Sequence, residues 1–242
     1  MHPECMSLEQ EISARSLRLP PGQRALDTFP RFGVVAFAKR PLELQEIRIE
    51  VFGALNSPIV LTASELTSLP RATLNADFHC AAGWSYRNLV WSGYRFIDVW
   101  ERLIPPHLRA NVELLVFRCQ DGFRTSLPLT DLLVPDVLIA DRLNDQPLTI
   151  EHGAPVRVVA PAHYGYKSPK HLKSIELRAS AGYRPLLPRF IDHPRARVAL
   201  EERGQFLPGW LLRYVFRPLI QPIIRSIERV TKDPSGTRRA DR

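Results

Sequence analysis

The sequence contains little cysteine and glycine and no long run of uncharged residues. Only three cysteines, Cys5, Cys80 and Cys119, occur in 242 residues, which is too few for a disulfide framework. This number fits a reducing compartment, or one cysteine with a chemical role. The 12 glycines against 22 prolines predict many turns and irregular connections. Every stretch of 18 residues contains a charge, so a membrane-spanning helix is not expected.

Residues 1–30 lack the features of an export signal. They contain no apolar run of the usual length, no twin-arginine pair and no small-residue cleavage site. We therefore expect a cytoplasmic location, and we expect residues 1–30 to form an extended arm.

The composition is that of a globular protein with a basic surplus. Hydrophobic residues make up 45% and charged residues 24%, which excludes a largely disordered chain, a collagen and a coiled coil. The net charge of +8 favours anionic partners. Nucleic acid is not an expected partner, because no basic stripe with interleaved aromatic residues occurs.

Apolar patterning predicts short strands and short helices without regular βα alternation. Strands are predicted at 47–52, 72–80, 112–119, 123–127, 155–160 and 174–177. Helices are predicted at 62–69, where Thr62 and Glu65 form a capping-box pattern, and at 96–103, 129–134 and 136–141. This mixture predicts an α+β fold with a mixed sheet and short helices over residues 31–180, followed by an extended tail.

The tail, residues 181–242, differs in character from the rest. A charged helix is predicted at 195–203, and the last residues, 232–242, should be a disordered basic tip. Between them lies an apolar segment, 206–227, which is interrupted by three arginines and three prolines. It has two interpretations: it packs on the domain's own surface, or it lies at a membrane surface or on a partner with its arginines directed outward.

Cys80 is the residue with the clearest chemical potential. It ends a predicted strand and opens a loop of small residues, Ala81-Ala82-Gly83, which permits close approach to the backbone. A thiolate is a strong, soft ligand for a transition metal. The alternative is a buried, inert cysteine, since free cysteine is among the most buried residue types.

Two blocks of sequence carry a family resemblance. The string FHCAAGWSYRNLVWSGYRF, residues 78–96, resembles the molybdenum-cysteine loop of sulfite-oxidase-type molybdopterin oxidoreductases. A second block, residues 121–177, contains EHGAPVR and YGYKSPK and is similar to the rest of that family's domain. The two blocks stand in the family's order and together cover residues 78–177.

The resemblance implies a Mo-molybdopterin cofactor and a set of residues that hold it. Cys80 matches the protein thiolate on molybdenum, and Cys119 stands where relatives often carry Ser or Thr near the cofactor. His152 and Arg157 match pterin-contacting positions. The predicted phosphate-binding turn is formed by Ser168, Pro169 and Lys170. Backbone amides in this turn would form an anion-binding nest, although Pro169 removes one amide.

Departures from the family pattern bear on the substrate. No arginine-rich stretch follows Cys80, and Asp141 stands near the place of the tyrosine found in sulfite-oxidising members. A carboxylate there would repel sulfite. The cysteine loop is nearer to that of methionine-sulfoxide reductase catalytic subunits. These features favour two-electron oxygen-atom transfer with reduction of a sulfoxide or similar oxide, and they make sulfite oxidation a weaker expectation.

The expected partners are a small-molecule substrate and a separate electron-transfer partner: a cytochrome, a flavoprotein or a quinone-linked protein. A monomer is expected, with contact at a membrane surface through residues 206–227 as the second interpretation of the tail. An alternative function is a non-catalytic molybdopterin-binding or interaction module with the same fold. Trp84, Asn88 and Trp91 are predicted to pack and fix the cysteine loop, and His79 and Arg87 are weaker candidates for the substrate side.

Overall fold

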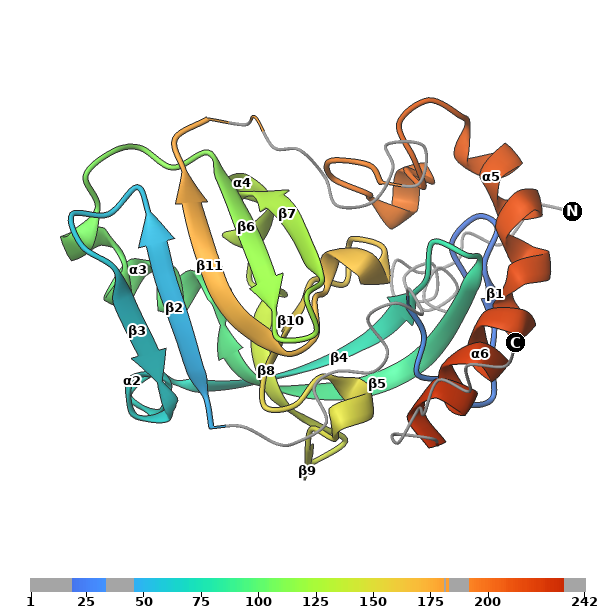
Figure 1. The fold of residues 1–242 in the computed structure, drawn as a ribbon, viewed down its shortest axis with the longest axis horizontal. Coiled ribbons are helices and arrows are strands. Elements are labelled where there is room, and N and C mark those ends of the chain that lie inside the picture. The colour runs from blue at the N-terminus through green and yellow to red at the C-terminus, as the bar shows by residue number, and fades with distance from the viewer. Residues whose placement is uncertain (1–18, 34–45, 181, 183–191, 233–242) are drawn as a thin grey trace, which may run out of the picture.

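A computed structural model describes residues 19–33, 46–180, 182 and 192–232. Its strands form two sheets that face each other, and the strands of one sheet cross those of the other (Figure 1). Helices are few and short in the body of the protein, so the predicted α+β class is confirmed.

The first sheet is built on one long strand, β5 (Trp84–Arg95). β4 (Arg71–His79) pairs antiparallel with β5 over most of its length. The remaining strands of this sheet are β1 (Arg24–Ala25), β8 (Leu138–Leu143), β9 (Gln146–Pro147) and β10 (Arg157–Val159). The β4–β5 hairpin places residues 80–83 at its tip.

The second sheet has the order β3-β2-β11-β6-β7. Its strands are β2 (Arg48–Gly53), β3 (Ile59–Thr62), β6 (Leu114–Cys119), β7 (Arg124–Pro128) and β11 (Leu172–Arg178). β2 and β11 are parallel, and the other neighbours are antiparallel. Parallel neighbours need a long crossover, and here the crossover contains every strand of the first sheet except β1, together with β3, β6 and β7.

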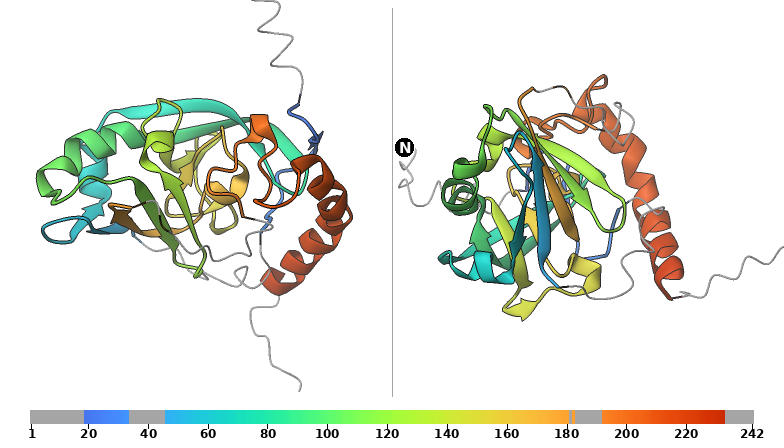
Figure 2. Two further views of the ribbon diagram at one scale, coloured as in Figure 1. Left: turned by 90° about the horizontal axis from the view of Figure 1, so that it is seen from above. Right: turned by 60° about the vertical axis from the view of Figure 1, so that its left-hand side comes forward.

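The main core is formed by buried side chains of both sheets. Figure 2 shows the two sheets facing each other. Alternate residues of each strand point into it, for example Ile49 and Val51 of β2 and Leu115 and Phe117 of β6, all fully buried. A second cluster on the first sheet surrounds Leu89 and Trp91 of β5. Burial of these apolar side chains fixes the strand registers, because a one-residue slip would turn them to solvent.

The helices are α2 (Ala63–Thr67), α3 (Phe96–Leu103), α4 (Leu129–Leu132), α5 (Gly209–Phe216) and α6 (Ile220–Lys232), with short 3₁₀ turns between elements. The capping box predicted at α2 is present: the Thr62 amide donates to Glu65 Oε2 at 2.8 Å. None of the helices in the described part of the chain is long and apolar enough to cross a membrane.

Two predicted helices are wrong. Residues 136–141 contribute to strand β8 instead, because Leu138, Ile139 and Ala140 are all buried, and periodicity cannot separate such a run from a buried helix. Residues 195–203 contain only a 3₁₀ turn, Val198–Leu200. Ala196 and Glu201 have positive φ values of 55° and 51°, which interrupt any α-helix there.

Both ends of the described chain lie against the β4–β5 hairpin. In the arm, Arg24 and Ala25 pair in parallel with Trp84 and Ser85. In the tail, α5 and α6 run past the hairpin tip (Figure 1). Residues 1–18 of the predicted arm and most of the predicted basic tip lie outside the described residues.

Candidate functional site

The thiol of Cys80 sits in the tight turn between β4 and β5. The Cys80 amide donates to the Trp84 carbonyl at 2.8 Å, and the Gly83 amide donates to the Cys80 carbonyl at 3.0 Å. Gly83 has φ of +99°, a conformation that the turn requires and that glycine adopts at low cost. The Ala82 amide points at Cys80 Sγ, 3.4 Å away. The turn therefore presents a half-buried sulfur that already receives one backbone N–H.

Residues from both ends of the chain hold this turn in place. Gln23 Nε2 donates to the Cys80 carbonyl at 3.1 Å, and Ser85 Oγ donates to Gln23 Oε1 at 3.1 Å. Arg203, fully buried, donates to the carbonyl oxygens of Ala81 and Pro21. Three segments distant in sequence, residues 21–23, residues 80–85 and Arg203, are thus joined by hydrogen bonds around the cysteine turn.

Cys80 lines a cavity of about 340 Å³. Its walls come from the arm, the cysteine turn, the 165–171 turn and the C-terminal helices. Most of the lining is aromatic or aliphatic, and the polar exceptions include Arg31, Asp121 and Lys170. An apolar cavity with a few polar groups is typical of a cofactor or small-molecule site.

Ser168, Pro169 and Lys170, which the family resemblance predicts as the phosphate-binding turn, line the same cavity as Cys80. The predicted anion-binding nest, however, is largely occupied: the Ser168 and His171 amides donate to the carbonyls of Gly165 and Gly153. Lys170 Nζ donates to the Glu151 carbonyl at 2.8 Å. Side-chain cations, rather than free amides, are therefore the anion-attracting groups of this turn.

Arg157 lies directly behind this turn on β10 and is fully buried. Its Nη1 donates to the His152 carbonyl at 3.0 Å, and its Nη2 donates to the Ser168 carbonyl at 2.8 Å. The guanidinium lies over the Trp91 ring, 5.0 Å from the centroid. Burial lowers the pKa of Arg157 to about 9, which still leaves it protonated at neutral pH. Arg157 joins the 152 and 168 segments and adds positive charge behind the cavity.

His152 is part of the same cluster but does not line the cavity. Its ring stacks on Phe29, with centroids 4.8 Å apart and planes 5° apart. His152 Nδ1 is buried and has no hydrogen-bond partner among the described residues. Burial, together with Lys170, Arg157 and Arg31, lowers its pKa to about 4. The neutral ring therefore has a free nitrogen next to three cations.

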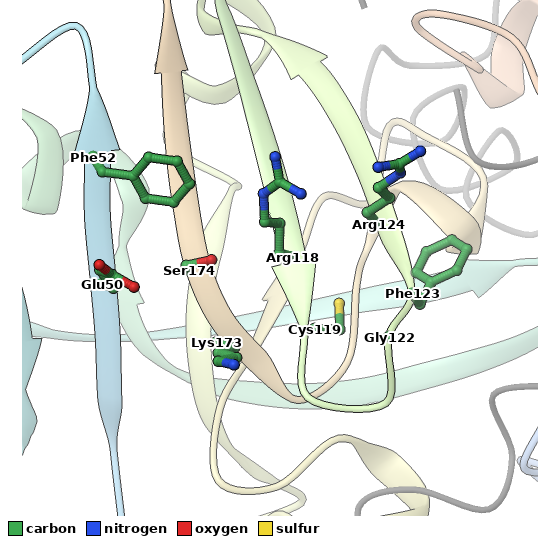
Figure 3. A pocket seen from close by; sticks show the side chains of 9 residues that line it. All are labelled: Glu50, Phe52, Arg118, Cys119, Gly122, Phe123, Arg124, Lys173 and Ser174. Atoms are coloured by element: carbon green, nitrogen blue, oxygen red, sulfur yellow. The ribbon is translucent and has the colours of Figure 1, made fainter. Parts of the chain in front are cut away.

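Cys119 is placed differently from the other predicted residues. It ends β6, is buried, and lines a separate open hollow of about 610 Å³ on the outer side of the second sheet (Figure 3). Arg118, Arg124 and Lys173 surround that hollow. Burial raises the pKa of the Cys119 thiol. Only Phe123 lines both hollows, so the two are separated by the β6–β7 turn.

The remaining sequence candidates have structural partners. Trp84 and Trp91 are each 1% exposed, as predicted for packing residues, and Trp84 also lines the cavity. Asn88 has a positive φ of 56°, which asparagine tolerates, and its amide donates to Asp77. His79 contacts Ser85, and Arg87 pairs with Asp77. Neither His79 nor Arg87 lines the cavity.

Asp141 does not lie at the cavity. Its carboxylate forms a bidentate pair with Arg71 of β4, at 2.7 and 3.0 Å. Since this charge is already paired and is not part of the cavity wall, the predicted repulsion of sulfite by Asp141 is not supported by the structure.

Three contributions to the site were not predicted from the sequence. Arg31 enters from the arm, Arg203 supports the turn from the tail, and the tail helices close the cavity. Residues Phe216, Leu219, Ile223 and Ile227 line the cavity at helical spacing. That spacing was the signal for a packed helix face, and the aromatic-flanked Arg31 in Phe29-Pro30-Arg31-Phe32 was the signal in the arm.

The site fits an anionic, metal-bearing organic cofactor. The thiol of Cys80 lines the cavity, and Arg31, Arg157 and Lys170 supply positive charge beside it. Burial and the neighbouring arginines lower the pKa of Lys170 to about 7, which a bound anion would reverse. His152 Nδ1 adds an unsatisfied hydrogen-bonding atom. Burial also raises the pKa of Cys80 to about 12, and a bound metal would overcome this by deprotonating the thiol.

Comparison with known proteins gives the class. Residues 37–183 match the family model described as an oxidoreductase molybdopterin binding domain. The chain is similar to the uncharacterized oxidoreductase YuiH of Bacillus subtilis, with 32% identity over 166 residues that cover 68% of this chain and 81% of that protein. It is 30% identical to a sulfite oxidase of Arabidopsis thaliana over 56% of this chain and 43% of that one.

Two further proteins are similar to this chain. A methionine-sulfoxide reductase catalytic subunit, MsrP, of Xanthomonas campestris is 25% identical over 69% of this chain and 59% of that protein. The chain thus spans about half the length of the sulfite oxidase and MsrP relatives. The sulfane dehydrogenase SoxCD of Paracoccus pantotrophus shares the fold, with a TM-score of 0.51 and 17% identity over 74% of this chain and 54% of that one.

This chain belongs to the oxidoreductase molybdopterin-binding family. It is an oxidoreductase of the sulfite-oxidase-like fold whose cofactor is Mo-molybdopterin.

Proposed function

We propose that Mo-molybdopterin occupies the cavity beside Cys80 and that the Cys80 thiolate is its protein ligand to molybdenum. The single observation that carries this is the position of Cys80 Sγ in a cavity shared with Ser168, Pro169 and Lys170. In this proposal, Lys170 and Arg31 bind the anionic part of the cofactor directly. Arg157 and His152 stand behind them, and Cys119 supports the β6–β7 turn at the edge of the site.

The cofactor would supply two-electron oxygen-atom transfer, and the protein would supply position and environment. Gln23 and Arg203 fix the Cys80 turn, so the thiol has one orientation. Aromatic side chains on the arm and on β4–β5 line the cavity and would limit the access of water to the bound cofactor. No residue of this chain is assigned a role as a general acid or a general base.

The proposed reaction is the reduction of a sulfoxide or a similar small oxide, with sulfite oxidation less favoured. The tail helices contribute Phe216, Leu219 and Ile223 to the cavity wall, and this part of the wall is apolar. No arginine lies in the Cys80–Gly83 turn to receive an oxyanion. An uncharged substrate suits such a wall better than sulfite does. MsrP among the relatives is named as a methionine-sulfoxide reductase, and this name favours the same choice.

The proposal includes a separate electron-transfer partner, a cytochrome, a flavoprotein or a quinone-linked protein. It also includes contact of residues 206–227 with a membrane surface. A non-catalytic molybdopterin-binding module remains the second candidate, because the cavity and its cations would serve binding without turnover equally well.

The test compares purified wild-type protein with Cys80→Ser. We expect about one molybdenum per chain and dye-linked reduction of methyl sulfoxides in the wild type. In Cys80→Ser we expect loss of turnover with retention of the fold, because sulfur and oxygen differ little in size. Cys5→Ser is the matched control, as it removes a thiol without an assigned role. Equal turnover in Cys80→Ser and wild type would refute the ligand assignment, and pterin binding without any turnover would favour the non-catalytic module.

A further inference from the structure

The exposed apolar side chains of this protein are confined to one region. Every large hydrophobic residue that is exposed in the described part of the chain lies between positions 200 and 219. They are Leu200, Phe206, Leu207, Trp210, Leu211, Tyr214, Val215 and Leu219, with exposures from 38% to 68%. Scattered exposed hydrophobics are ordinary, whereas a single contiguous group marks an interaction surface.

The helix spacing of these residues makes them one face. Trp210, Leu211, Tyr214 and Val215 stand at positions i, i+1, i+4 and i+5 of α5, which places them on one side of the helix, and Leu207 lies just before the helix begins. We call this face the α5 strip. The opposite side of α5 packs against the rest of the protein, since Leu212 is 2% exposed and Phe216 lines the cavity. The segment therefore packs on the domain and, at the same time, leaves a second apolar face uncovered.

The charge of the segment complements an anionic surface. From residue 206 to the end, the sequence has eight Lys and Arg against three Asp and Glu, so this part carries most of the net +8. Arg225 and Arg229 of α6 are exposed. An apolar strip rich in Trp, Tyr and Leu beside basic residues is the pattern of a helix that lies in the interface of an anionic bilayer.

We infer that the α5 strip docks the protein on an anionic lipid surface, with Trp210 and Tyr214 inserted among the headgroups and Arg225 and Arg229 of α6 on the lipid phosphates. This rests on, and makes specific, the membrane contact proposed for residues 206–227. Neither α5 nor α6 is long and apolar enough to span the bilayer, so the helices lie on it. Leu219 is 47% exposed and also lines the Cys80 cavity, so the docked face borders the cavity.

The four tryptophans allow a direct test on the full chain. Trp84, Trp91 and Trp100 are 1%, 1% and 9% exposed, whereas Trp210 is 55% exposed. Lipid insertion should therefore shift tryptophan emission to the blue and protect it from acrylamide through Trp210 alone. Vesicles of phosphatidylcholine mixed with phosphatidylglycerol are compared with vesicles of phosphatidylcholine alone, by flotation and by fluorescence.

We expect flotation with the mixed vesicles and little with phosphatidylcholine alone. Trp210→Ser combined with Tyr214→Ser should lower the partition coefficient about tenfold or more, since two interfacial anchors are lost. Arg225→Ala combined with Arg229→Ala should weaken binding, and the weakening should vanish at high salt. The matched control, Arg102→Ala with Arg109→Ala, removes two exposed arginines near α3 and should bind as the wild type does.

Two results would overturn the inference. One is equal flotation of the Trp210/Tyr214 variant and the wild type. The other is a blue shift that grows with protein concentration without vesicles, which would assign the strip to a second copy of the chain. Sulfoxide turnover measured in solution is unaffected by either result, so failure here is separate from failure of the proposed reaction.

Discussion

Arg203 donates a hydrogen bond to the carbonyl oxygen of Ala81, 122 residues earlier in the chain. The guanidinium is fully buried and lies over the Tyr164 ring, 4.9 Å from the centroid. A residue of the C-terminal tail thus fixes the peptide that follows Cys80. The tail therefore contributes directly to the structure of the site.

Replacing Arg203 should loosen the cysteine turn. Arg203→Met keeps much of the volume but leaves the Ala81 and Pro21 carbonyls without their donor, which costs about 1–3 kcal/mol of unfolding free energy. We expect a lower thermal midpoint and a severalfold loss of molybdenum per chain, measured by metal analysis. Arg213→Met is the control, because Arg213 pairs only with Glu201 at 3.7 Å and with an aromatic face. Equal loss in both variants would contradict a specific role for Arg203.

Arg157 should contribute strongly to stability even without cofactor. Arg157→Met removes the donors to the carbonyls of His152 and Ser168, both in a buried region. We expect the unfolding free energy to fall by about 2–4 kcal/mol in urea titrations of the cofactor-free protein. Arg225→Met, at an exposed position, should change it by less than about 0.5 kcal/mol. If Arg157→Met lost no more unfolding free energy than Arg225→Met, the buried hydrogen bonds of the Arg157 guanidinium would not be important for stability.

His171 should make the cofactor-free protein sensitive to acid. The ring is 1% exposed and its Nδ1 donates to the Ala154 carbonyl at 2.7 Å. Burial, with Lys170, Arg31 and Arg157, lowers its pKa to about 4. Between about pH 6.5 and pH 4 the unfolded chain takes up a proton that the folded chain does not. Stability is therefore full above this window and falls as the pH drops through it, by up to about 3 kcal/mol from this group.

The measurement is the unfolding free energy as a function of pH in wild type and in His171→Asn. Asparagine tolerates the φ of 55° at this position and can keep the bond to Ala154. We expect the slope between pH 4 and 6.5 to become shallower in His171→Asn than in the wild type. An unchanged slope in His171→Asn would show that the His171 ring of the wild type takes up its proton equally in the folded and unfolded chains.

The apolar wall should set preference among substrates. Ile223 lines the cavity, whereas its neighbour Ile224 does not, although both are half-buried on α6. Ile223→Gln should raise the KM for methyl phenyl sulfoxide about five- to tenfold and change the KM for dimethyl sulfoxide less. Ile224→Gln is the matched control. Parallel changes in the two variants would place the substrate away from α6.

The sequence predicted those parts of the fold and site that are written in local patterns. The α2 capping box, α3, the strand just before Cys80 and the strand ending at Cys119 have distinctive periodicity or turn residues, and all of them are present. The β8 strand was mistaken for a helix because its run is apolar on both faces. Long pairings such as β1 with β5 depend on contacts between distant residues, and no local pattern encodes them.

The same distinction applies to the site. A shared family pattern located Cys80, Ser168, Pro169 and Lys170, and the structure brings these residues to one cavity. Arg31 and Arg203 were missed because a single arginine in a polar arm or a charged tail looks like a solvated residue. Their burial is a property of the assembled chain, which only three-dimensional packing determines.

Gln23 donates a hydrogen bond to the Cys80 carbonyl, and Arg203 donates one to the Ala81 carbonyl, although 180 positions separate the two donors along the polypeptide. During synthesis, the thiol of Cys80 emerges well before the second of these supports exists. The turn acquires its finished shape only after Arg203 has left the ribosome, so metal insertion follows synthesis of this residue, and chains truncated before it should stay metal-free.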